Sequence, residues 1–301
     1  MEVVLKRREF LANAPRAAIG GALPLALASA AQGGDHSGKK SVSGADPLAG
    51  LAKPRDLKKT PFKRLVILGE STVHGGPWLH RDEERYADIL VRHINACQEN
   101  PVEYHNKGIS ANAISPRSPG YGESAKPSAL ERYKTDVVAL QPDLFLLCYG
   151  LNDMRAAMPI RDFREDMATI IRDVKKACSP VIVLTTVYYM TSWRSFPPYD
   201  KGSAALAMKY NDCIRGLASE FQCIVADAWS AEGAADWLIH YDGVHANQVG
   251  NIVLGNKIFE ALVQHCSGLT NKAYMQERDT EWTKETTRLR ADVGDPFTKT
   301  W

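Results

Sequence analysis

Short runs of consecutive apolar residues alternate with segments of helical periodicity through most of this chain. The clearest runs occupy residues 65–68 and 144–147, and continuous runs of this kind are typical of strands buried on both faces of a sheet. Residues 181–187 form a run rich in β-branched residues, which also predicts a strand. Weaker strand candidates lie at residues 102–106 and 223–226. Apolar residues recur at helical spacing in five segments: 82–97, 127–140, 160–178, 203–221 and 246–265. The alternation predicts one α/β domain with a five-stranded parallel sheet and helices on both of its faces.

Three residues able to take part in chemistry stand directly after predicted strands. Ser71 follows the run at 65–68, Gly108 follows the strand candidate at 102–106, and Asn152 follows the run at 144–147. The carboxyl ends of parallel strands lie at one edge of the sheet, where ligands bind in open α/β folds. We therefore expect Ser71, Gly108 and Asn152 to lie in one common site.

An acid and a histidine occur together in the segment H-Y-D-G-V-H near the last predicted helix. Asp242 and His245 are three residues apart, so both side chains can lie on one side of a loop or helix entry. Asp242 would accept a hydrogen bond from one imidazole nitrogen while the other nitrogen faces Ser71, as in a serine–histidine–acid triad. Two alternatives remain open: Asp242 caps the last helix, or His240, Asp242 and His245 are metal ligands.

The remaining motif residues also have plain structural interpretations. A serine after a strand is commonly a helix N-cap, and Gly108 and Asn152 are ordinary turn residues when each is judged alone. The sequence around Ser71 is not the G-x-S-x-G elbow of α/β-hydrolases, because Val73 stands at the position of the second glycine. Only the order and spacing of the motifs together favour catalysis.

Four segments occur in a fixed order: L-G-E-S-T, N-K-G, Y-G-L-N-D and D-G-V-H, which end at residues 72, 108, 153 and 245. Together they resemble the four blocks of the SGNH hydrolases, the GDSL esterase/lipase family, which are marked by Ser, Gly, Asn and His. The resemblance spans about residues 64–265 and implies a flavodoxin-like three-layer α/β/α sandwich. One departure is Glu70, which stands where the family usually has Asp.

The resemblance implies a role for each motif residue. Ser71 is the expected nucleophile, and its backbone amide also serves the oxyanion. Gly108 supplies a second amide and Asn152 a side-chain donor to the oxyanion, while Asp242 orients the general base His245. These parts would hydrolyse a carboxylic ester through an acyl-serine intermediate, and this mechanism needs no metal and no organic cofactor.

Aromatic and polar side chains that follow the strands are the predicted substrate-binding residues. They are Trp78 after the nucleophile, Arg155 after the asparagine block, and Tyr188 and Trp193 after the fourth strand. Such a rim suits sugar rings and also acyl chains, and loop packing is the structural alternative. We expect short acyl groups, above all O-acetyl groups on carbohydrate, to be the substrate. The alternatives are a lipid, lysophospholipid or aryl esterase, a non-catalytic carbohydrate-binding protein, and a metal-dependent hydrolase.

The N-terminus resembles a twin-arginine signal peptide. Arg7 and Arg8 precede an apolar stretch at about residues 17–27, and residues 28–30 read Ala-Ser-Ala, as at a cleavage site. The stretch is too short to span ~30 Å of hydrocarbon, so no stable membrane anchor is expected. The prediction is export by the twin-arginine machinery to the periplasm or the medium. The chain then divides into a signal peptide (1–30), a linker (31–60), the hydrolase domain (61–267) and a polar C-terminal extension (268–301).

Charge and cysteine content exclude other classes of protein. The net charge is +2, from 37 basic and 35 acidic residues, and no basic stripe indicates a nucleic-acid partner. None of the 6 cysteines is in C-x-x-C spacing, so a zinc or dithiol redox motif is not expected. Cys148, within an apolar strand pattern, is expected to be a buried thiol.

Overall fold

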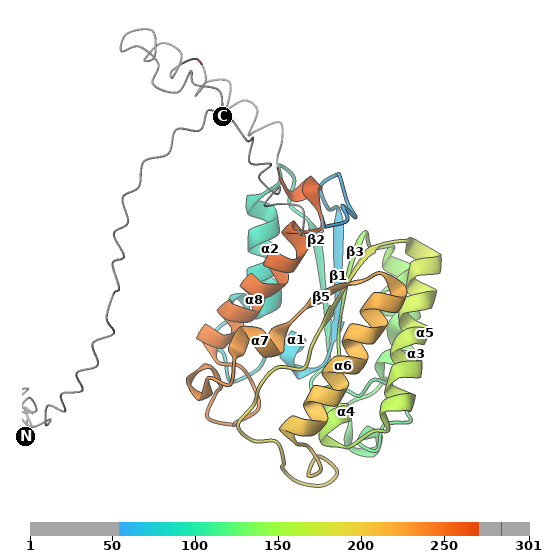
Figure 1. Cartoon of the computed structure of the whole chain (residues 1–301), viewed down its shortest axis with the longest axis vertical. Helices are drawn as coiled ribbons and strands as arrows, with labels where there is room; N and C mark the ends of the chain where they lie inside the picture. Colours follow the sequence, from blue (N-terminus) through green and yellow to red (C-terminus); the bar gives the residue numbers. More distant parts are fainter. Residues whose placement is uncertain (1–53, 271–283, 285–301) are drawn as a thin grey trace, which may run out of the picture. The chain divides into compact units, whose positions relative to one another are not determined.

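A computed structural model describes residues 54–270 and residue 284 of the chain. Its sheet has five strands: β1 (Arg64–Gly69), β2 (Glu103–Gly108), β3 (Leu144–Cys148), β4 (Val181–Thr185) and β5 (Ile224–Ala226). All neighbouring strands are parallel, and their order is β2-β1-β3-β4-β5 (Figure 1). The predicted five-stranded parallel sheet is confirmed.

Helices cover both faces of the sheet. The α-helices are α1 (Ser71–His74), α2 (Tyr86–Ala96), α3 (Ala129–Asp136), α4 (Leu151–Arg155), α5 (Ile160–Cys178), α6 (Ala204–Phe221), α7 (Ala228–Glu232) and α8 (Gln248–Val263). Short 3-10 turns lie at Asp82–Glu84, Tyr121–Glu123, Val138–Leu140, Asp236–Leu238 and Ser267–Leu269. Helix α8 packs beside α2 and α7, and α5 packs beside α3 and α6 (Figure 1). The result is the predicted three-layer α/β/α sandwich.

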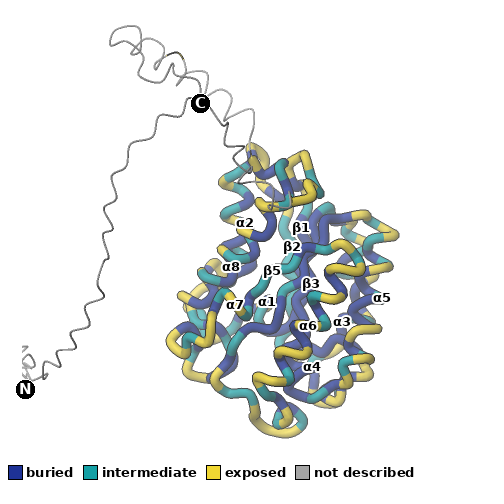
Figure 2. The backbone as a smooth tube through the Cα atoms, viewed as in Figure 1, coloured by how far each residue is buried: buried dark blue, intermediate teal, exposed yellow. Residues whose placement is uncertain are grey.

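The apolar runs form the centre of the sheet because both of their faces are covered by helices. All residues of β3 are buried, as are those of β1 after Arg64 and those of β4 before Thr185 (Figure 2). Strand β2 has no apolar run, and it lies at one edge of the sheet, half-buried after its first residue. Because an edge strand is less covered than a central one, β2 does not need a continuous apolar run, and its sequence predicts a strand only weakly.

Capping residues determine where several helices begin. Hydrophobic periodicity alone predicts these positions only to within a few residues. Ser128 and Glu131 form a capping box, so α3 begins at Ala129 rather than at residue 127. Ser203 caps α6 by accepting from the Leu206 amide, and Asn247 caps α8. Helix formation thus begins where a side-chain oxygen satisfies amides of the first turn.

The domain begins earlier than the predicted boundary at residue 61. Leu57 N donates to His265 O at 2.7 Å, and Gly268 N donates to Lys58 O at 2.9 Å. Ser267 Oγ also donates to Asp56 Oδ2 at 2.6 Å. Residues 56–58, expected in the linker, therefore pack on the end of the domain. The predicted signal peptide, the linker up to residue 53, and most of the C-terminal extension lie outside the described residues.

All 6 cysteines lie in the described part of the chain and are free thiols, with Cys148 and Cys266 buried. Burial of Cys148 in β3 agrees with its expected role as a core residue. Within the described residues, none of the helices has both the length and the apolar character needed to cross a membrane.

Candidate active site

Two catalytic candidates lie where the strand order reverses. Strands β2 and β3 lie on opposite sides of β1, so the connections after β1 and β3 diverge at the carboxyl end of the sheet. Ser71 begins α1 directly after β1, and Asn152 is the second residue of α4, which follows β3. A switch point of this kind is the usual ligand site of open parallel sheets.

Ser71, His245 and Asp242 form a continuous hydrogen-bonded row. Ser71 Oγ is 2.9 Å from His245 Nε2, and His245 Nδ1 is 2.8 Å from Asp242 Oδ2. Ser71 is mostly buried, with 7% of its surface exposed. With the proton of the ring on Nδ1, Nε2 is free to take the hydroxyl proton of Ser71. The structure brings the three predicted catalytic residues together, although Ser71 and His245 are 174 residues apart in sequence.

The second oxygen of Asp242 holds its own loop together. Oδ1 accepts from the amides of Val244 (2.8 Å) and His245 (3.0 Å), while His240 Nδ1 lies 3.2 Å from Oδ2. Burial favours the neutral acid, but the hydrogen bonds from His245 and Val244 outweigh it and hold the pKa of Asp242 well below its ordinary value. Asp242 is therefore ionised at neutral pH. The alternative that it caps the last helix is wrong, because Asn247 caps α8.

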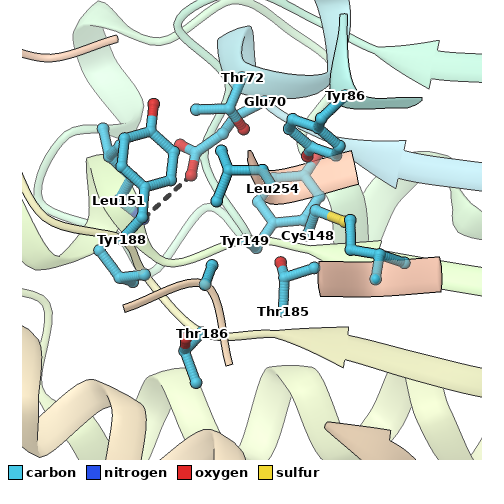
Figure 3. Close-up of a pocket in the computed structure, with 13 residues that line it drawn as sticks. Glu70, Thr72, Tyr86, Cys148, Tyr149, Leu151, Thr185, Thr186, Tyr188 and Leu254 are labelled. Atoms are coloured by element: carbon cyan, nitrogen blue, oxygen red, sulfur yellow. Dashed lines mark hydrogen bonds between the residues drawn. The ribbon is translucent and has the colours of Figure 1, made fainter. Parts of the chain in front are cut away.

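Glu70 joins the nucleophile segment to the asparagine segment. Its carboxylate accepts from the Leu151 amide at 2.9 Å (dashed in Figure 3) and from the Asn152 amide at 3.1 Å. These are the first two amides of α4, which have no partner within the helix. Burial, and then the neighbouring Asp153, raises the pKa of Glu70 to about 8. The residue that departs from the family pattern thus ties the start of α4, which carries Asn152, to the residue before Ser71.

The side-chain amide of Asn152 is oriented by a single backbone acceptor. Nδ2 donates to Asn112 O at 3.0 Å, and its second N–H has no acceptor among residues 54–270. The neighbouring Ala111 has φ +53°, a left-handed conformation that residues with a Cβ rarely adopt. The backbone N–H of Ala111 donates to no atom of residues 54–270. Backbone strain of this kind clusters at functional sites, so Ala111 is a candidate site residue.

Gly108 does not match its predicted role. Its N–H already donates to Asn106 Oδ1 at 2.9 Å, so it is not available to an oxyanion. A Cβ at this position would lie 2.3 Å from His74 N, so glycine is needed for β2 to approach α1. The prediction was wrong because a close-packing glycine and an oxyanion glycine look alike in a single sequence.

A buried arginine that sequence reasoning missed holds the ends of β1 and β2. Arg132 Nη1 donates to Lys107 O at 2.8 Å, and Nη2 donates to Gly69 O at 3.2 Å and to Tyr149 Oη at 2.8 Å. Tyr149 in turn donates to Asn112 Oδ1 at 2.5 Å. The network connects the carboxyl end of the sheet to the loop beside Asn152. Arg132 lies in an ordinary helical pattern, so its sequence carries no signal of this role.

Trp78, predicted to bind substrate, stacks on the general base. Its ring lies parallel to that of His245, with a tilt of 2° and a centroid separation of 3.5 Å. The indole is only half-buried, so its other parts face the surroundings of the site. The structure therefore places Trp78 in the site, with a direct contact to a catalytic side chain.

Tyr188, predicted in the same rim, is instead buried. Its ring points into an internal cavity lined also by Glu70, Thr72, Tyr86 and Cys148 (Figure 3). The cavity offers about 20 Å³ to water, room for roughly one molecule. It is too small for an ester substrate. The rim prediction for Tyr188 is wrong, because Tyr188 is buried and lines this cavity with Glu70 and Thr72, the two neighbours of Ser71 in sequence.

The other two predicted rim residues, Trp193 and Arg155, lie in the segment after β4 and at the end of α4. Trp193 packs in a cluster with Tyr189 and Trp229, with ring centroids 6.0 Å from each. The preceding residue, Ser192, donates its amide to Gly243 O at 2.7 Å, which ties this loop to the segment that carries His245. Arg155 is the last residue of α4 and is buried.

Within the described residues, no three or more His, Cys, Asp or Glu side chains are arranged to hold a metal ion. The sequence left His240, Asp242 and His245 open as metal ligands. In the structure the Nδ1 atoms of both histidines contact Asp242 Oδ2 directly.

A parallel three-layer sandwich with this serine–histidine–aspartate row at its switch point defines a hydrolase of the SGNH type. The model of the GDSL-like lipase/acylhydrolase family matches residues 67–251, and the chain belongs to this family. The family supports an ester hydrolase. A search of curated proteins found no match to this chain.

Solved structures of low sequence identity share the fold. A lipase/acylhydrolase from Enterococcus faecalis is 22% identical (TM-score 0.54), and the match covers 66% of this chain and 95% of that one. An α/β hydrolase from the metagenome of Lake Arreo, Spain, is 20% identical (TM-score 0.53), with 71% and 99% covered. An acetylxylan esterase from Geobacillus stearothermophilus is 17% identical (TM-score 0.51), with 68% and 96% covered.

Proposed function

We propose that this protein is a serine esterase that removes short acyl groups, above all O-acetyl groups, from carbohydrate. The observation that carries the esterase mechanism is the row from Asp242 through His245 to Ser71, with contacts of 2.8 and 2.9 Å. This row supplies a nucleophile, a base that takes its proton, and an anion that stabilises the charged base.

The reaction proceeds in two halves. His245 Nε2 takes the proton of Ser71 as Oγ attacks the ester carbonyl, and the imidazolium then returns that proton to the leaving alcohol. Water next attacks the acyl-serine, with His245 again as the base, and releases the acid and free Ser71. Asp242 stays ionised throughout, which agrees with its depressed pKa.

Three donors are proposed for the oxyanion. They are the backbone N–H of Ser71, which is in the first turn of α1 and has no helical acceptor, the free side-chain N–H of Asn152, and the N–H of Ala111 in place of that of Gly108. Support for Ala111 comes from its amide, which has no acceptor among residues 54–270, and from the hydrogen bond between its neighbour Asn112 and Asn152.

Exposed aromatic rings beside the catalytic loop support a carbohydrate substrate. Trp237 is 79% exposed and Tyr241 is 94% exposed, and both precede His245 by a few residues. Sequence reasoning did not single out either ring. Flat, exposed aromatic faces suit stacking on sugar rings. The acetylxylan esterase with the same fold points in the same direction.

The test is release of 4-nitrophenol from acetate, butyrate, octanoate and palmitate esters. We expect the acetate to be the best substrate and the Ser71→Ala variant to be inactive, while Ser219→Ala, an exposed serine on α6, keeps full activity. Preference for long chains would instead indicate a lipid esterase. Equal rates for the wild type and Ser71→Ala would contradict the serine mechanism and favour a binding protein or a metal-dependent hydrolase.

The carbohydrate part of the proposal has a separate test. Tyr241→Ala and Trp237→Ala should raise KM for an acetylated xylo-oligosaccharide several-fold and leave KM for 4-nitrophenyl acetate unchanged, because the small ester reaches Ser71 without the rings. Equal KM values of variants and wild type for the oligosaccharide would remove these rings from the site.

Export by the twin-arginine route also remains a proposal, which rests on the sequence of residues 1–30. Replacement of Arg7 and Arg8 by lysine should leave the protein in the cytoplasm, as measured by fractionation of the producing cells. An unchanged distribution would contradict this route.

A further inference from the structure

A buried arginine lies one helical turn from the proposed oxyanion asparagine. Arg155 and Asn152 are three residues apart on α4, so their side chains emerge on the same side of the helix. Only 7% of the surface of Arg155 is exposed. The position places a permanent positive charge one helical turn from Asn152, because a guanidinium stays protonated in proteins.

The guanidinium of Arg155 has no hydrogen-bond or ion-pair partner among the described residues, and its Nε is buried without an acceptor. Arg132 also has a buried Nε without an acceptor, but its Nη1 contacts Asp136 at 2.8 Å. Arg117 contacts Asp166 at 2.6 Å. Burial of an unpaired charge is unfavourable, so an arginine kept in this state has donors available to a ligand.

The surroundings of Arg155 locate these donors near the reacting atoms. Burial lowers the pKa of its guanidinium, while the nearby carboxylates of Glu70 and Asp242 act in the opposite direction. Glu70 adjoins Ser71, and Asp242 is hydrogen-bonded to His245. The geometry of α4 agrees with this placement: Glu70 accepts from the Leu151 and Asn152 amides at the start of the helix, and Arg155 is its last residue. Arg155 forms no ion pair with Glu70 or Asp242.

The loop after β4 packs against the backbone and the aliphatic part of the Arg155 side chain. Lys201 N donates to Arg155 O at 3.1 Å. A Cβ on Gly202 would lie 3.2 Å from both Cα and Cγ of Arg155, so the loop backbone packs directly on the stem. This support limits the freedom of the side chain and makes it a preorganised donor.

We propose that Arg155 binds an anionic group on the alcohol side of the substrate, so that the enzyme selects O-acetyl esters of acidic sugars. The inference rests on the proposed function: an acetyl group carries no charge, so the anion must belong to the sugar. A planar guanidinium matches a carboxylate or a phosphate with two parallel hydrogen bonds. The sugar is therefore either a uronic acid or a sugar phosphate.

The test compares kcat/KM for three substrates: acetylated glucuronic acid, acetylated glucose 6-phosphate and acetylated glucose. The wild type should prefer at least one anionic ester over the neutral ester by about tenfold or more, the size expected for hydrogen bonds to a charged group. Which ester is preferred distinguishes carboxylate from phosphate. Arg155→Gln should bring the ratio close to one, and Arg155→Lys should restore part of it.

Lys201→Gln is the matched control, because it removes an exposed positive charge from the segment that contacts Arg155. It should leave the anionic-to-neutral ratio unchanged. A wild-type ratio near one, or a ratio that Arg155→Gln does not alter, would overturn the inference. Hydrolysis that survives in Ser71→Ala would show instead that the proposed function itself has failed.

A measurement on the wild type alone covers the case in which the Arg155 variants do not fold. Glucuronate or glucose 6-phosphate should inhibit hydrolysis of 4-nitrophenyl acetate competitively, at a concentration about tenfold lower than glucose does. Equal inhibition by the charged and neutral sugars would overturn the inference.

Discussion

The indole ring of Trp78 lies flat against the imidazole ring of His245, with centroids 3.5 Å apart and planes tilted by 2°. The two nitrogens of the same imidazole contact Ser71 and Asp242. Trp78 therefore covers one face of the proposed general base and restricts its rotation. The negative face of an aromatic ring also attracts the imidazolium that forms during acyl transfer.

Loss of this stack should slow the chemical step. The interaction of a cation with an aromatic face contributes about 0.5–2 kcal/mol, so Trp78→Ala should lower kcat for 4-nitrophenyl acetate about twofold to thirtyfold. Trp78→Phe keeps an aromatic face and should lose less. Steady-state kinetics on both variants provides the measurement, and an unchanged kcat in Trp78→Ala would show that the stack is only packing.

Removal of the side-chain amide of Asn152 should damage catalysis without abolishing it. One oxyanion donor is worth about 10²–10³ in kcat, so Asn152→Ala should lose that factor while KM changes little. Asn251→Ala offers a contrast, since Asn251 is a buried asparagine that bonds to the Tyr86 amide rather than lying at the switch point. We expect Asn251→Ala to reduce thermal stability. Near-normal turnover of Asn152→Ala would remove Asn152 from the site.

Replacement of Ala111 by glycine should reduce stability less than replacement of an alanine inside a helix does. The left-handed conformation at φ +53° costs a residue with a Cβ about 1–2 kcal/mol, and glycine adopts it freely. Ala111→Gly should therefore keep both its esterase activity and its free energy of unfolding, or gain up to about 1 kcal/mol. In contrast, Ala168→Gly inside α5 should lose about 1 kcal/mol. Equal losses in the two variants on urea denaturation would contradict strain at Ala111.

Glu232 should make the domain less stable as pH rises. It ends α7 with 2% exposure, neither carboxyl oxygen has a hydrogen-bond partner in the described residues, and burial raises its pKa to about 8 from 4.5. Between these values the folded chain holds a proton that the unfolded chain releases. The contribution of Glu232 to the free energy of unfolding therefore falls as pH rises, by at most about 1.4 kcal/mol per pH unit.

Glu232→Gln cannot ionise, so its stability relative to the wild type should increase between pH 4.5 and 8. Urea denaturation at several pH values measures this difference. Glu260→Gln, at an exposed position on α8, serves as the control and should not show it. A difference between Glu232→Gln and wild type that stays constant with pH would refute the prediction.

The central strands and the catalytic row could be predicted from sequence because their signals are local. Residues 65–68 and 144–147 are continuous apolar runs, and burial on both faces of the sheet requires such runs. Asp242 and His245 are close in sequence, and their relation to Ser71 follows from the shared edge of a parallel sheet. The blocks of the family supplied the order of the roles.

Other parts of the site depend on contacts between distant segments. Gly108 does not have its predicted role because its amide donates to Asn106 Oδ1. Ala111, to which the sequence assigned no role, adopts a left-handed conformation that alanine rarely takes. Arg132 and Trp78 lie in segments that look like an ordinary helix and an ordinary loop, and their partners are far away in the chain.

By itself the sequence determined the class of fold, the order of its strands and helices along the chain, and the identity of the serine, histidine and aspartate that meet in the site. Only the tertiary structure decided which amides are free, which side chains are buried, and which ring covers His245. The reason is physical: hydrophobic periodicity reports how each segment meets the core, whereas the availability of a donor depends on which neighbours the folded chain brings within about 3 Å of it.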